Sequence, residues 1–251
     1  MNAPSPSLLV RYGNLLFRWR NTIFPVVLLA LFFTFRPVWP GGSERGDNLL
    51  DLVGILVALA GQALRVAVIG YKYIVRGGKN QRVYAEDLVT SGFFAHSRNP
   101  LYLGNILVLL GLFLVHNNPW VYAIGIPFFL TGYIAIVAAE EAFLRGKFGA
   151  AYDAYCRDVP RWIPRFRGLS QSLAGIPFNW RRVILKEYGS TYAWLGGAII
   201  LMVADTLRFR PYADRASYLN ALWCAAGVAT VLYGTARWLK LSRRLRDPSP
   251  V

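Results

Sequence analysis

Apolar residues gather in long runs along this 251-residue chain, and short polar stretches separate the runs. A helix needs about 20 mostly apolar residues to cross the roughly 30 Å hydrocarbon core of a bilayer. Six runs approach that length, so the pattern predicts an all-α, polytopic transmembrane helical bundle of about six spans. The runs cover residues 22–39, 49–71, 101–117, 120–139, 190–207 and 217–238.

The third and fourth runs are joined only by residues 116–119, which contain no Lys or Arg. A connection this short makes its two helices antiparallel neighbours, so we expect a tight helical hairpin. Polar stretches flank the hairpin, one at residues 88–104 and one that begins with the adjacent carboxylates Glu140 and Glu141. We expect these stretches to face each other across the hairpin and to form one site at the membrane surface.

After the two carboxylates, apolar residues recur with the spacing of one helical face. Leu144, Phe148, Tyr152 and Tyr155 are four, four and three residues apart. This spacing predicts a single amphipathic helix that lies along the membrane surface, with its arginines turned to water and lipid phosphate. Two prolines within residues 158–164 end that helix, because proline disfavours further helical turns.

The positive charge of the chain is placed as in a membrane protein. Hydrophobic residues make up 55% of the chain and charged residues 16%, with a formal net charge of +15. The basic residues stand at the ends of apolar runs, so membrane lipids are the expected partners and nucleic acid is not. Counting Lys and Arg on alternate sides gives 22 on the side of both termini and 5 on the other. We expect both termini and the site to face the cytoplasm, in the plasma (inner) membrane.

The composition changes near residues 165–190, where Gly, Ser and Pro interrupt the pattern. We therefore expect a membrane core at residues 1–165 and, at residues 166–251, a linker, a C-terminal transmembrane hairpin and a basic tail. Lateral packing or oligomer contact is the simplest role for that hairpin, and the alternative is a wall of a lipid access path. Cys156 and Cys224 fall in different environments, so we expect reduced thiols, no disulfide and no metal site.

Arg65 stands inside the second apolar run. A guanidinium at hydrocarbon depth costs at least about 2.5 kcal/mol unless it faces a partner or a wet cavity, so we expect Arg65 to point inward. Gln62 lies three residues earlier on the same helical face, and the pair could bind a substrate carboxylate or phosphate. The alternative is that Arg65 pairs with a helix carboxylate such as Glu140 and only joins two spans.

Adjacent helical residues point about 100° apart, so Glu140 and Glu141 cannot face the same pocket. We expect one to face inward and the other outward. A partly buried carboxylate could bind a cationic ligand group or take up a proton at a raised pKa. The alternative is an interfacial acidic pair that only begins a surface helix.

The polar stretch before the hairpin contains candidates with simpler structural interpretations. Pro100 suits a first helical turn and Asn99 can cap it, a role that needs no ligand. His96 is a possible base, although a solvated loop histidine is the simpler interpretation, and His116 belongs to the connector. The sequence contains no Gly-rich dinucleotide fingerprint, P-loop, Gly-x-Ser-x-Gly or Cys/His cluster, so these soluble catalytic motifs are absent.

Two motifs flank the expected hairpin within residues 86–164. LVTSGFF and RNPLYLG precede it, and EEAFLRGKFGAAYDAYCRDVPRWIP follows it. This arrangement resembles the isoprenylcysteine carboxyl methyltransferase and phospholipid methyltransferase family of integral membrane enzymes. The family pattern is Leu-Val-x-x-Gly-x-Tyr, Arg-His-Pro-x-Tyr-x-Gly, a hairpin, and then Glu-Glu-x-x-Leu-x-x-x-Phe-Gly-x-x-Tyr-x-x-Tyr.

The resemblance implies S-adenosyl-L-methionine as cofactor and a lipophilic, membrane-embedded substrate, with an isoprenylcysteine-like carboxylate or a lipid head group as acceptor. Glu140 would hold the ammonium of the methionine part. Beside the resemblance, the residues themselves give Arg65 a catalytic role with Glu140 and place Gln62 and Arg65 at the substrate. Catalysis then requires mainly alignment, because the sulfonium is already activated. The implied cofactor contacts are Glu86, Leu88, Val89, Phe94, Asn99, Pro100, Leu101, Tyr102 and Glu140.

The chain departs from the family pattern at four positions. Asn99 replaces the family His and cannot take up a proton at neutral pH, which argues against proton transfer there. Glu86 stands where the prenylcysteine enzymes have His, and Phe94 replaces a Tyr. Ile136 occupies the place of their substrate-binding Arg, so a prenylcysteine carboxylate lacks its expected partner unless Arg65 supplies the charge.

The sequence leaves several functions open. A carboxylate acceptor would favour an anion site centred on Arg65, whereas phospholipid amine N-methylation would need a base, for which Glu140 or Glu141 is the candidate. An NADPH-dependent membrane reductase is an alternative of another class, because sterol reductases share a similar helical cofactor module. An inactive membrane scaffold is the third alternative.

Overall fold

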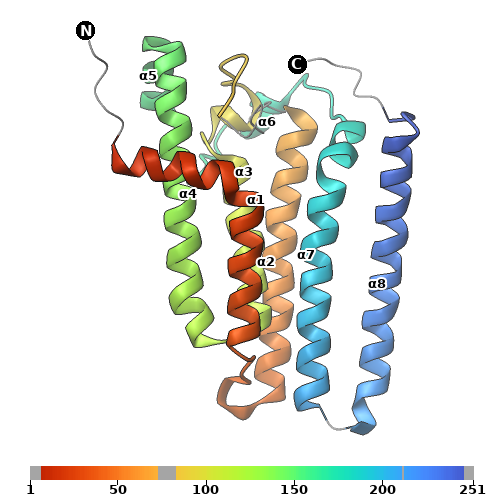
Figure 1. The fold of residues 1–251 in the computed structure, drawn as a ribbon. Coiled ribbons are helices and arrows are strands. Elements are labelled where there is room, and N and C mark those ends of the chain that lie inside the picture. Colours follow the sequence, from red (N-terminus) through yellow and green to blue (C-terminus); the bar gives the residue numbers. More distant parts are fainter. Residues whose placement is uncertain (1–6, 73–82, 211, 246–251) are drawn as a thin grey trace.

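The computed structural model describes residues 7–72, 83–210 and 212–245, and the described part of the chain is helical (Figure 1). The all-α bundle that the apolar runs predict is confirmed. Five helices, α1, α2, α4, α7 and α8, are long and apolar enough to cross a membrane, and α3 is a shorter apolar helix of 17 residues. In chain order the elements are α1 (Leu8–Thr34), η1 (Pro40–Gly42), α2 (Glu44–Tyr71), η2 (Gly92–Ala95), α3 (Pro100–His116), α4 (Pro119–Phe148), α5 (Ala150–Asp158), α6 (Leu169–Leu173), α7 (Trp180–Phe209) and α8 (Tyr212–Leu241).

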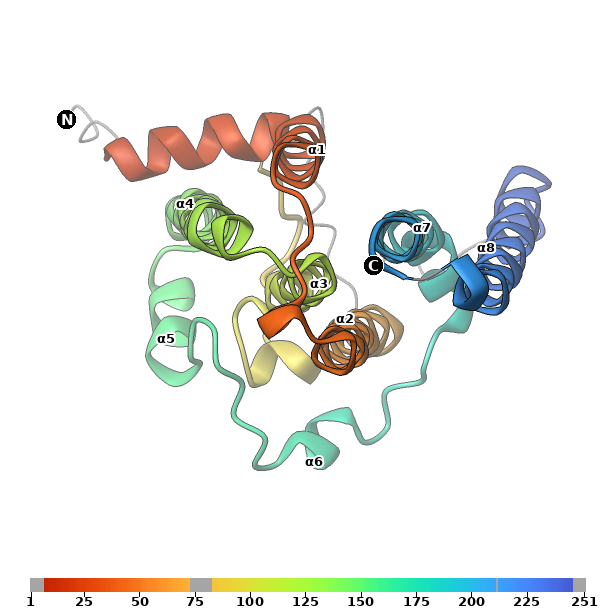
Figure 2. The same cartoon turned by 90° about the horizontal axis from the view of Figure 1, so that it is seen from below.

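Helix α1 is longer than predicted and bends. Its first part crosses α4 at a steep angle, and its second part runs along the bundle (Figures 1 and 2). The crossing part packs through Leu16 and Phe17 against Ala135 and Ile136 of α4. Its basic side chains alternate with exposed apolar ones such as Leu8, the composition of a helix that lies at a membrane interface.

The closest helix pair is α2 with α3, and glycines make it possible. Gly54 lies opposite Gly111, and Gly61 lies opposite Gly104. A Cβ atom added at Gly111 would lie 2.4 Å from the carbonyl oxygen of Gly54, and one added at Gly61 would lie 2.6 Å from that of Gly104. Small residues at a helix interface let two backbones approach closely inside a membrane.

The turn between α3 and α4 is as short as predicted. Asn117 adopts φ 45°, and the side chain of Asn118 accepts the N–H of Trp120 at 2.8 Å. His116 lies in this connector as expected, with Nε2 2.7 Å from the carbonyl oxygen of Phe35. The expected tight packing along the hairpin is wrong, because α3 packs mainly on α2 and α4 packs mainly on α1.

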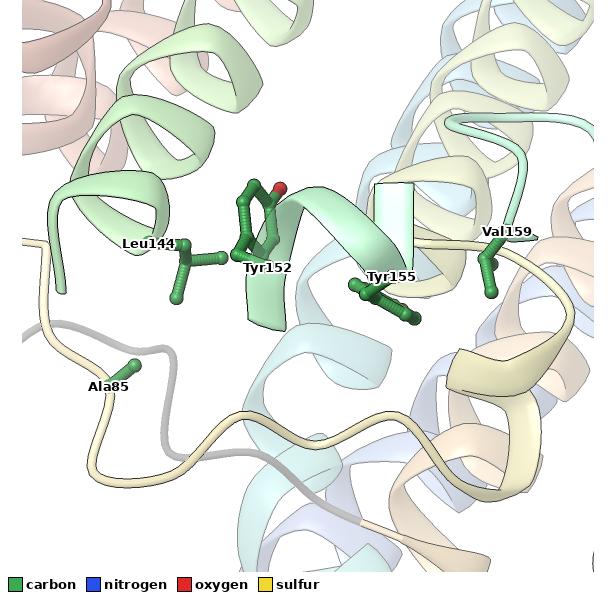
Figure 3. Close-up of a cluster of buried hydrophobic side chains, with 5 residues drawn as sticks. All are labelled: Ala85, Leu144, Tyr152, Tyr155 and Val159. Carbon is green, nitrogen blue, oxygen red and sulfur yellow. The ribbon is translucent and has the colours of Figure 1, made fainter. Parts of the chain in front are cut away.

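The single surface helix predicted after the carboxylates is also wrong. Helix α4 continues to Phe148, Gly149 turns the chain with φ 51°, and α5 follows. The apolar stripe still forms one cluster, in which Leu144 of α4 lies beside Tyr152 of α5 and Tyr155 lies farther along α5 (Figure 3). The turn at Gly149 folds that stripe on itself, so that it packs against the segment around Ala85. As predicted, α5 ends at Asp158.

Helices α7 and α8 form the C-terminal hairpin. Helix α7 packs on α2 and α3, whereas α8 packs on α7 and lies outermost (Figure 2). The side chains of Trp223, Val231 and Leu232 on α8 are exposed, as expected of a helix whose outer face meets lipid. The position of α7 against α3 brings this hairpin to the cavity described next.

Candidate functional site

A cavity of about 780 Å³ lies among α1, α3 and α7, which Figure 2 shows end-on. Its volume falls within the usual range for ligand sites, about 300–1,000 Å³. Most of its wall is apolar, and each of the helices α1, α2, α3, α4 and α7 contributes side chains. The apolar lining includes Phe24, Leu28, Phe32, Ile69, Leu109, Leu112, Phe129 and Ala193.

Several predicted site residues meet in this cavity. Phe94 and the stretch Asn99, Pro100, Leu101 and Tyr102 line it together with Arg65. Phe94 is 1% exposed and packs with Leu101 around Val68 of α2. The motif before the hairpin therefore forms part of the wall that the predicted substrate residue Arg65 also lines.

Glu140 reaches the same wall through one hydrogen bond. The hydroxyl of Tyr102 donates to Oε1 of Glu140 at 2.6 Å, and Nη1 of Arg20 donates to the Tyr102 oxygen at 3.2 Å. The Arg65–Glu140 pair, considered as the alternative to substrate binding, is not formed, and Arg65 pairs with another helix carboxylate, Glu187. Instead, Tyr102 connects the carboxylate of α4 to the cavity.

Three of the predicted cofactor residues lie elsewhere. Glu86 is exposed, and its carbonyl oxygen accepts the ammonium of Lys147 at 3.0 Å. Leu88 packs against the Tyr152 cluster, and Val89 packs behind Phe94. These three residues are not among those that line the 780 Å³ cavity.

The side chain of Asn99 does not cap α3, so the predicted capping role is wrong. Its amide nitrogen donates to the carbonyl oxygen of Arg161 at 3.0 Å, and the backbone N–H of Arg98 donates to that of Pro160 at 2.9 Å. The hydroxyl of Ser97 donates to the carbonyl of Trp162 at 3.0 Å. The polar stretch thus binds the chain that leaves α5.

His96 is buried, so the solvated-loop interpretation is wrong. Its Nδ1 lies 2.5 Å from the carbonyl oxygen of Arg165, and its Nε2 lies 2.8 Å from the hydroxyl of Ser172. A carbonyl oxygen can only accept, so Nδ1 carries the proton and, in the neutral ring, Nε2 accepts from Ser172. His96 anchors the linker and does not line the cavity.

Glu140 and Glu141 are both buried, at 3% and 5% exposure, so the expectation that one faces outward is wrong. They do point to different partners, as their helical positions require. Glu141 pairs with Arg98 at 3.0 Å and accepts both Nε and Nη2 of Arg161. The hydrogen bond to Glu141 raises the pKa of Arg161. Glu141 thus joins α4 to the stretch before α3 and to the chain that leaves α5.

Replacing Glu141 with Gln is expected to lower the stability of the protein by about 3 kcal/mol, because it leaves two arginines without their carboxylate. This is the low end of the range for buried pairs, since the side chain of Arg161 is 39% exposed. Thermal unfolding in detergent measures the loss. The matched control is Asp153→Asn, which breaks the half-exposed pair with Arg145 and should cost less than about 1 kcal/mol. Equal losses would contradict the role given to Glu141.

Arg65 pairs with Glu187, a residue that the sequence interpretation missed. Nε of Arg65 donates to Oε2 of Glu187 at 2.8 Å, and Nη2 lies 2.6 Å from Oε1. Nη1 donates to Oδ1 of Asn105 on α3. Gln62 donates to Oε2 of Glu187 at 3.0 Å and accepts Nε1 of Trp194 at 2.9 Å. Arg65 and Gln62 do act together, but their shared partner is a carboxylate of the chain itself.

Comparison with known proteins adds the family. Residues 51–151 match the family described as phospholipid methyltransferase, and a stretch of 152 residues is 28% identical to human protein-S-isoprenylcysteine O-methyltransferase. The chain is similar to this methyltransferase family over residues 51–151, less than half of its length. Together with the five long apolar helices, this similarity supports an integral membrane protein.

Other relatives of the chain carry a different description. The chain is 31% identical over 158 residues to the cobalt-zinc-cadmium resistance protein CzcN of Cupriavidus metallidurans, a match that covers 61% of the chain and 66% of CzcN. It is 29% identical over 168 residues to the nickel-cobalt-cadmium resistance protein NccN of Alcaligenes xylosoxydans xylosoxydans, which covers 65% of the chain and 70% of NccN. The human match covers 57% of the chain and about half of the enzyme, 51%. No solved structure matches the chain.

The family match ends at residue 151, shortly after α5 begins, so α7 and α8 lie beyond it. Helix α7 nevertheless supplies Glu187 and Trp194 to the cavity. Helix α7 of the C-terminal hairpin thus forms part of the cavity wall. Glu187 is an acidic residue near the start of α7, and nothing in the sequence connected it to Arg65.

Proposed function

We propose that this protein transfers a methyl group from S-adenosylmethionine to a lipophilic substrate embedded in the membrane. The observation that carries the proposal is the gathering of the family motifs at one cavity. Phe94 and residues 99–102 line it, and Glu140 adjoins it through Tyr102. A cavity with an apolar wall and a few convergent polar groups is typical of a small-molecule site.

The residues present fit the cofactor. Glu140 is a buried carboxylate beside the cavity and would hold the ammonium of the methionine part. Phe94, Pro100 and Leu101 offer apolar surface for the adenine ring. When bound, S-adenosylmethionine supplies a methyl group that a sulfonium has already activated, so the chain needs only to align the acceptor and exclude water.

The lipophilic part of the substrate has a path along the same cavity. Its α1 wall presents Phe24, Leu28 and Phe32, and its α7 wall presents Ala193 and Gly197. Relatives named for isoprenylcysteine O-methylation and a family named for phospholipids both support an acceptor with a long apolar tail. We infer that the tail lies between α1 and α7 and that the head group approaches residues 99–102.

We infer that the site faces the cytoplasm. The start of α1, the stretch around η2, and α5 and α6 gather at one end of the bundle (Figure 1). Most of the basic residues outside the spans belong to the segments at this end, and the excess of Lys and Arg marks the cytoplasmic side.

The first test is cofactor binding by the purified full-length protein. S-adenosylhomocysteine should raise its thermal stability, by about 2.7 kcal/mol at a hundred times the dissociation constant. NADPH should not raise it, because the proposal gives the dinucleotide no site. Stabilisation by NADPH alone would favour a reductase, and stabilisation by neither would favour a scaffold.

The second test is methyl transfer. The protein is incubated with labelled S-adenosylmethionine, extracted membrane lipids and prenylated peptides, and the label in each pool is measured. We expect incorporation into at least one lipophilic acceptor. A protein that binds the cofactor product but labels no pool would contradict the proposed reaction.

A further inference from the structure

The guanidinium of Arg65 has a partner at each of its three nitrogens. Two bind the carboxylate of Glu187 side by side, and the third binds Asn105. Arginine offers its donors in a fixed fork that matches one carboxylate. Glu187 therefore occupies the position that the carboxylate of a substrate would need.

A second layer of hydrogen bonds holds Glu187 in this position. Gln62 donates to the same oxygen that accepts Nε of Arg65, and Trp194 fixes Gln62 from the other side. Glu187 is 3% exposed, and both it and Arg65 line the cavity. The network joins α2 to α7, and its buried charges cancel.

Two further cations line the cavity. Arg20 is half-buried, stacks 4.2 Å from the ring centre of Phe17 and donates to Tyr102. Lys186 is exposed. Charges in contact with solvent attract anions more weakly than a charge in a low-dielectric interior. Arg65, whose side chain is 15% exposed, would be a strong anion site of the cavity, and Glu187 neutralises it.

We propose that Glu187 is a specificity residue that makes the cavity select uncharged head groups over carboxylates. This inference rests on the proposed methyl transfer and narrows its acceptor to an uncharged nucleophile, such as a hydroxyl, a thiol or an amine free base. The lone pair of that nucleophile forms the bond to the methyl carbon, the carbon–sulfur bond breaks with its pair left on sulfur, and the proton is released to water. A carboxylate acceptor would first have to displace Glu187 from Arg65.

A matched pair of ligands tests the selection without requiring turnover. N-acetyl-S-farnesylcysteine carries a free carboxylate, and its methyl ester has the same tail without the charge. Binding of each to the full-length protein in detergent is measured by thermal stabilisation. The wild type should bind the ester at least as tightly as the acid. Glu187→Gln, which keeps the shape but frees the charge of Arg65, should shift the ratio of affinities towards the acid by about tenfold or more.

Two variants make the result specific. The double variant Arg65→Gln, Glu187→Gln removes both charges and should return the ratio to the wild-type value. The double variant also keeps the test decisive if Glu187→Gln alone fails to fold. If the wild type bound the acid and the double variant did not, Arg65 would bind anions in the wild type, contrary to the inference. Glu44→Gln, which breaks a pair with Arg210 far from the cavity, should leave the ratio unchanged.

A wild-type preference of tenfold or more for the acid, or a ratio that Glu187→Gln leaves unchanged, would overturn the inference. Either result is compatible with stabilisation by S-adenosylhomocysteine and with labelling of a lipid pool, so the proposed function would survive it. If the protein neither bound S-adenosylhomocysteine nor labelled any lipid pool, the proposed function itself would be contradicted. The two failures are therefore distinguishable.

Discussion

Replacing Glu140 with Gln is expected to weaken S-adenosylhomocysteine binding and to slow methyl transfer by about ten- to a hundredfold. The reason is the loss of a charge-assisted hydrogen bond to the ammonium of the cofactor, worth about 1.5–3 kcal/mol. Gln keeps the size of the side chain and can still accept the hydroxyl of Tyr102, which lies 2.6 Å from Oε1 in the wild type. The effect should therefore appear in binding and turnover rather than in folding.

Equilibrium binding of S-adenosylhomocysteine and transfer of labelled methyl groups measure the effect of this change. Tyr102→Phe is a milder variant for comparison, because it removes the hydroxyl that orients Glu140 but keeps the carboxylate. It should reduce cofactor binding and methyl transfer less than Glu140→Gln does. Glu44→Gln, on the far side of the bundle, is the control for loss of a carboxylate elsewhere. Unchanged binding in Glu140→Gln would show that this carboxylate does not hold the cofactor.

Replacing Gly111 with Leu is expected to prevent stable folding. Even a Cβ atom there would lie 2.4 Å from the carbonyl oxygen of Gly54 and 2.7 Å from Cβ of Ala58. Overpacking in a core costs about 1–3 kcal/mol, and a clash with backbone exceeds that range because backbone cannot rotate away. Helices α2 and α3 would have to separate, and Arg65 and Asn105 would move apart with them.

The matched control is Gly227→Leu on α8, because a Cβ atom at Gly227 meets nothing within 4 Å. Yield of monodisperse protein and thermal unfolding in detergent compare the two variants. Gly227→Leu should behave as the wild type. Wild-type stability of Gly111→Leu would show that α2 and α3 are not in close contact through these glycines.

The bundle could be predicted because membrane spans depend on local composition. Runs of about 20 apolar residues identify a helix whatever its neighbours are. The first part of α1 escaped this criterion, because Arg11 and Arg18 interrupt its apolar residues. Gly149 did offer a sign of the break between α4 and α5, but the regular spacing from Leu144 to Tyr155 favoured one continuous helix.

In the candidate site, too, local sequence features could be predicted and long-range contacts could not. Phe94 and residues 99–102 were predicted from motifs that are contiguous in the chain, and the structure places them at one cavity. The partner of Arg65 could not be predicted, because Glu187 lies 122 residues away and only the packing of α7 on α2 brings them together. Similarly, the choice of Asn99 between capping α3 and binding residue 161 depends on where the chain after α5 returns.

The separation of Arg65 and Glu187 in the chain has a consequence for biogenesis. At about 5–20 residues per second, the ribosome needs roughly 6–24 s to extend the chain from Arg65 to Glu187, which is 122 positions later. During that interval α2 carries a guanidinium without its carboxylate, so its insertion must be supported by the apolar residues around Arg65 and by Asn105. Arrival of α7 then completes both the wall of the cavity and its charge balance. A ribosome-bound chain that ends before α7 would hold an anion site that the finished protein has closed.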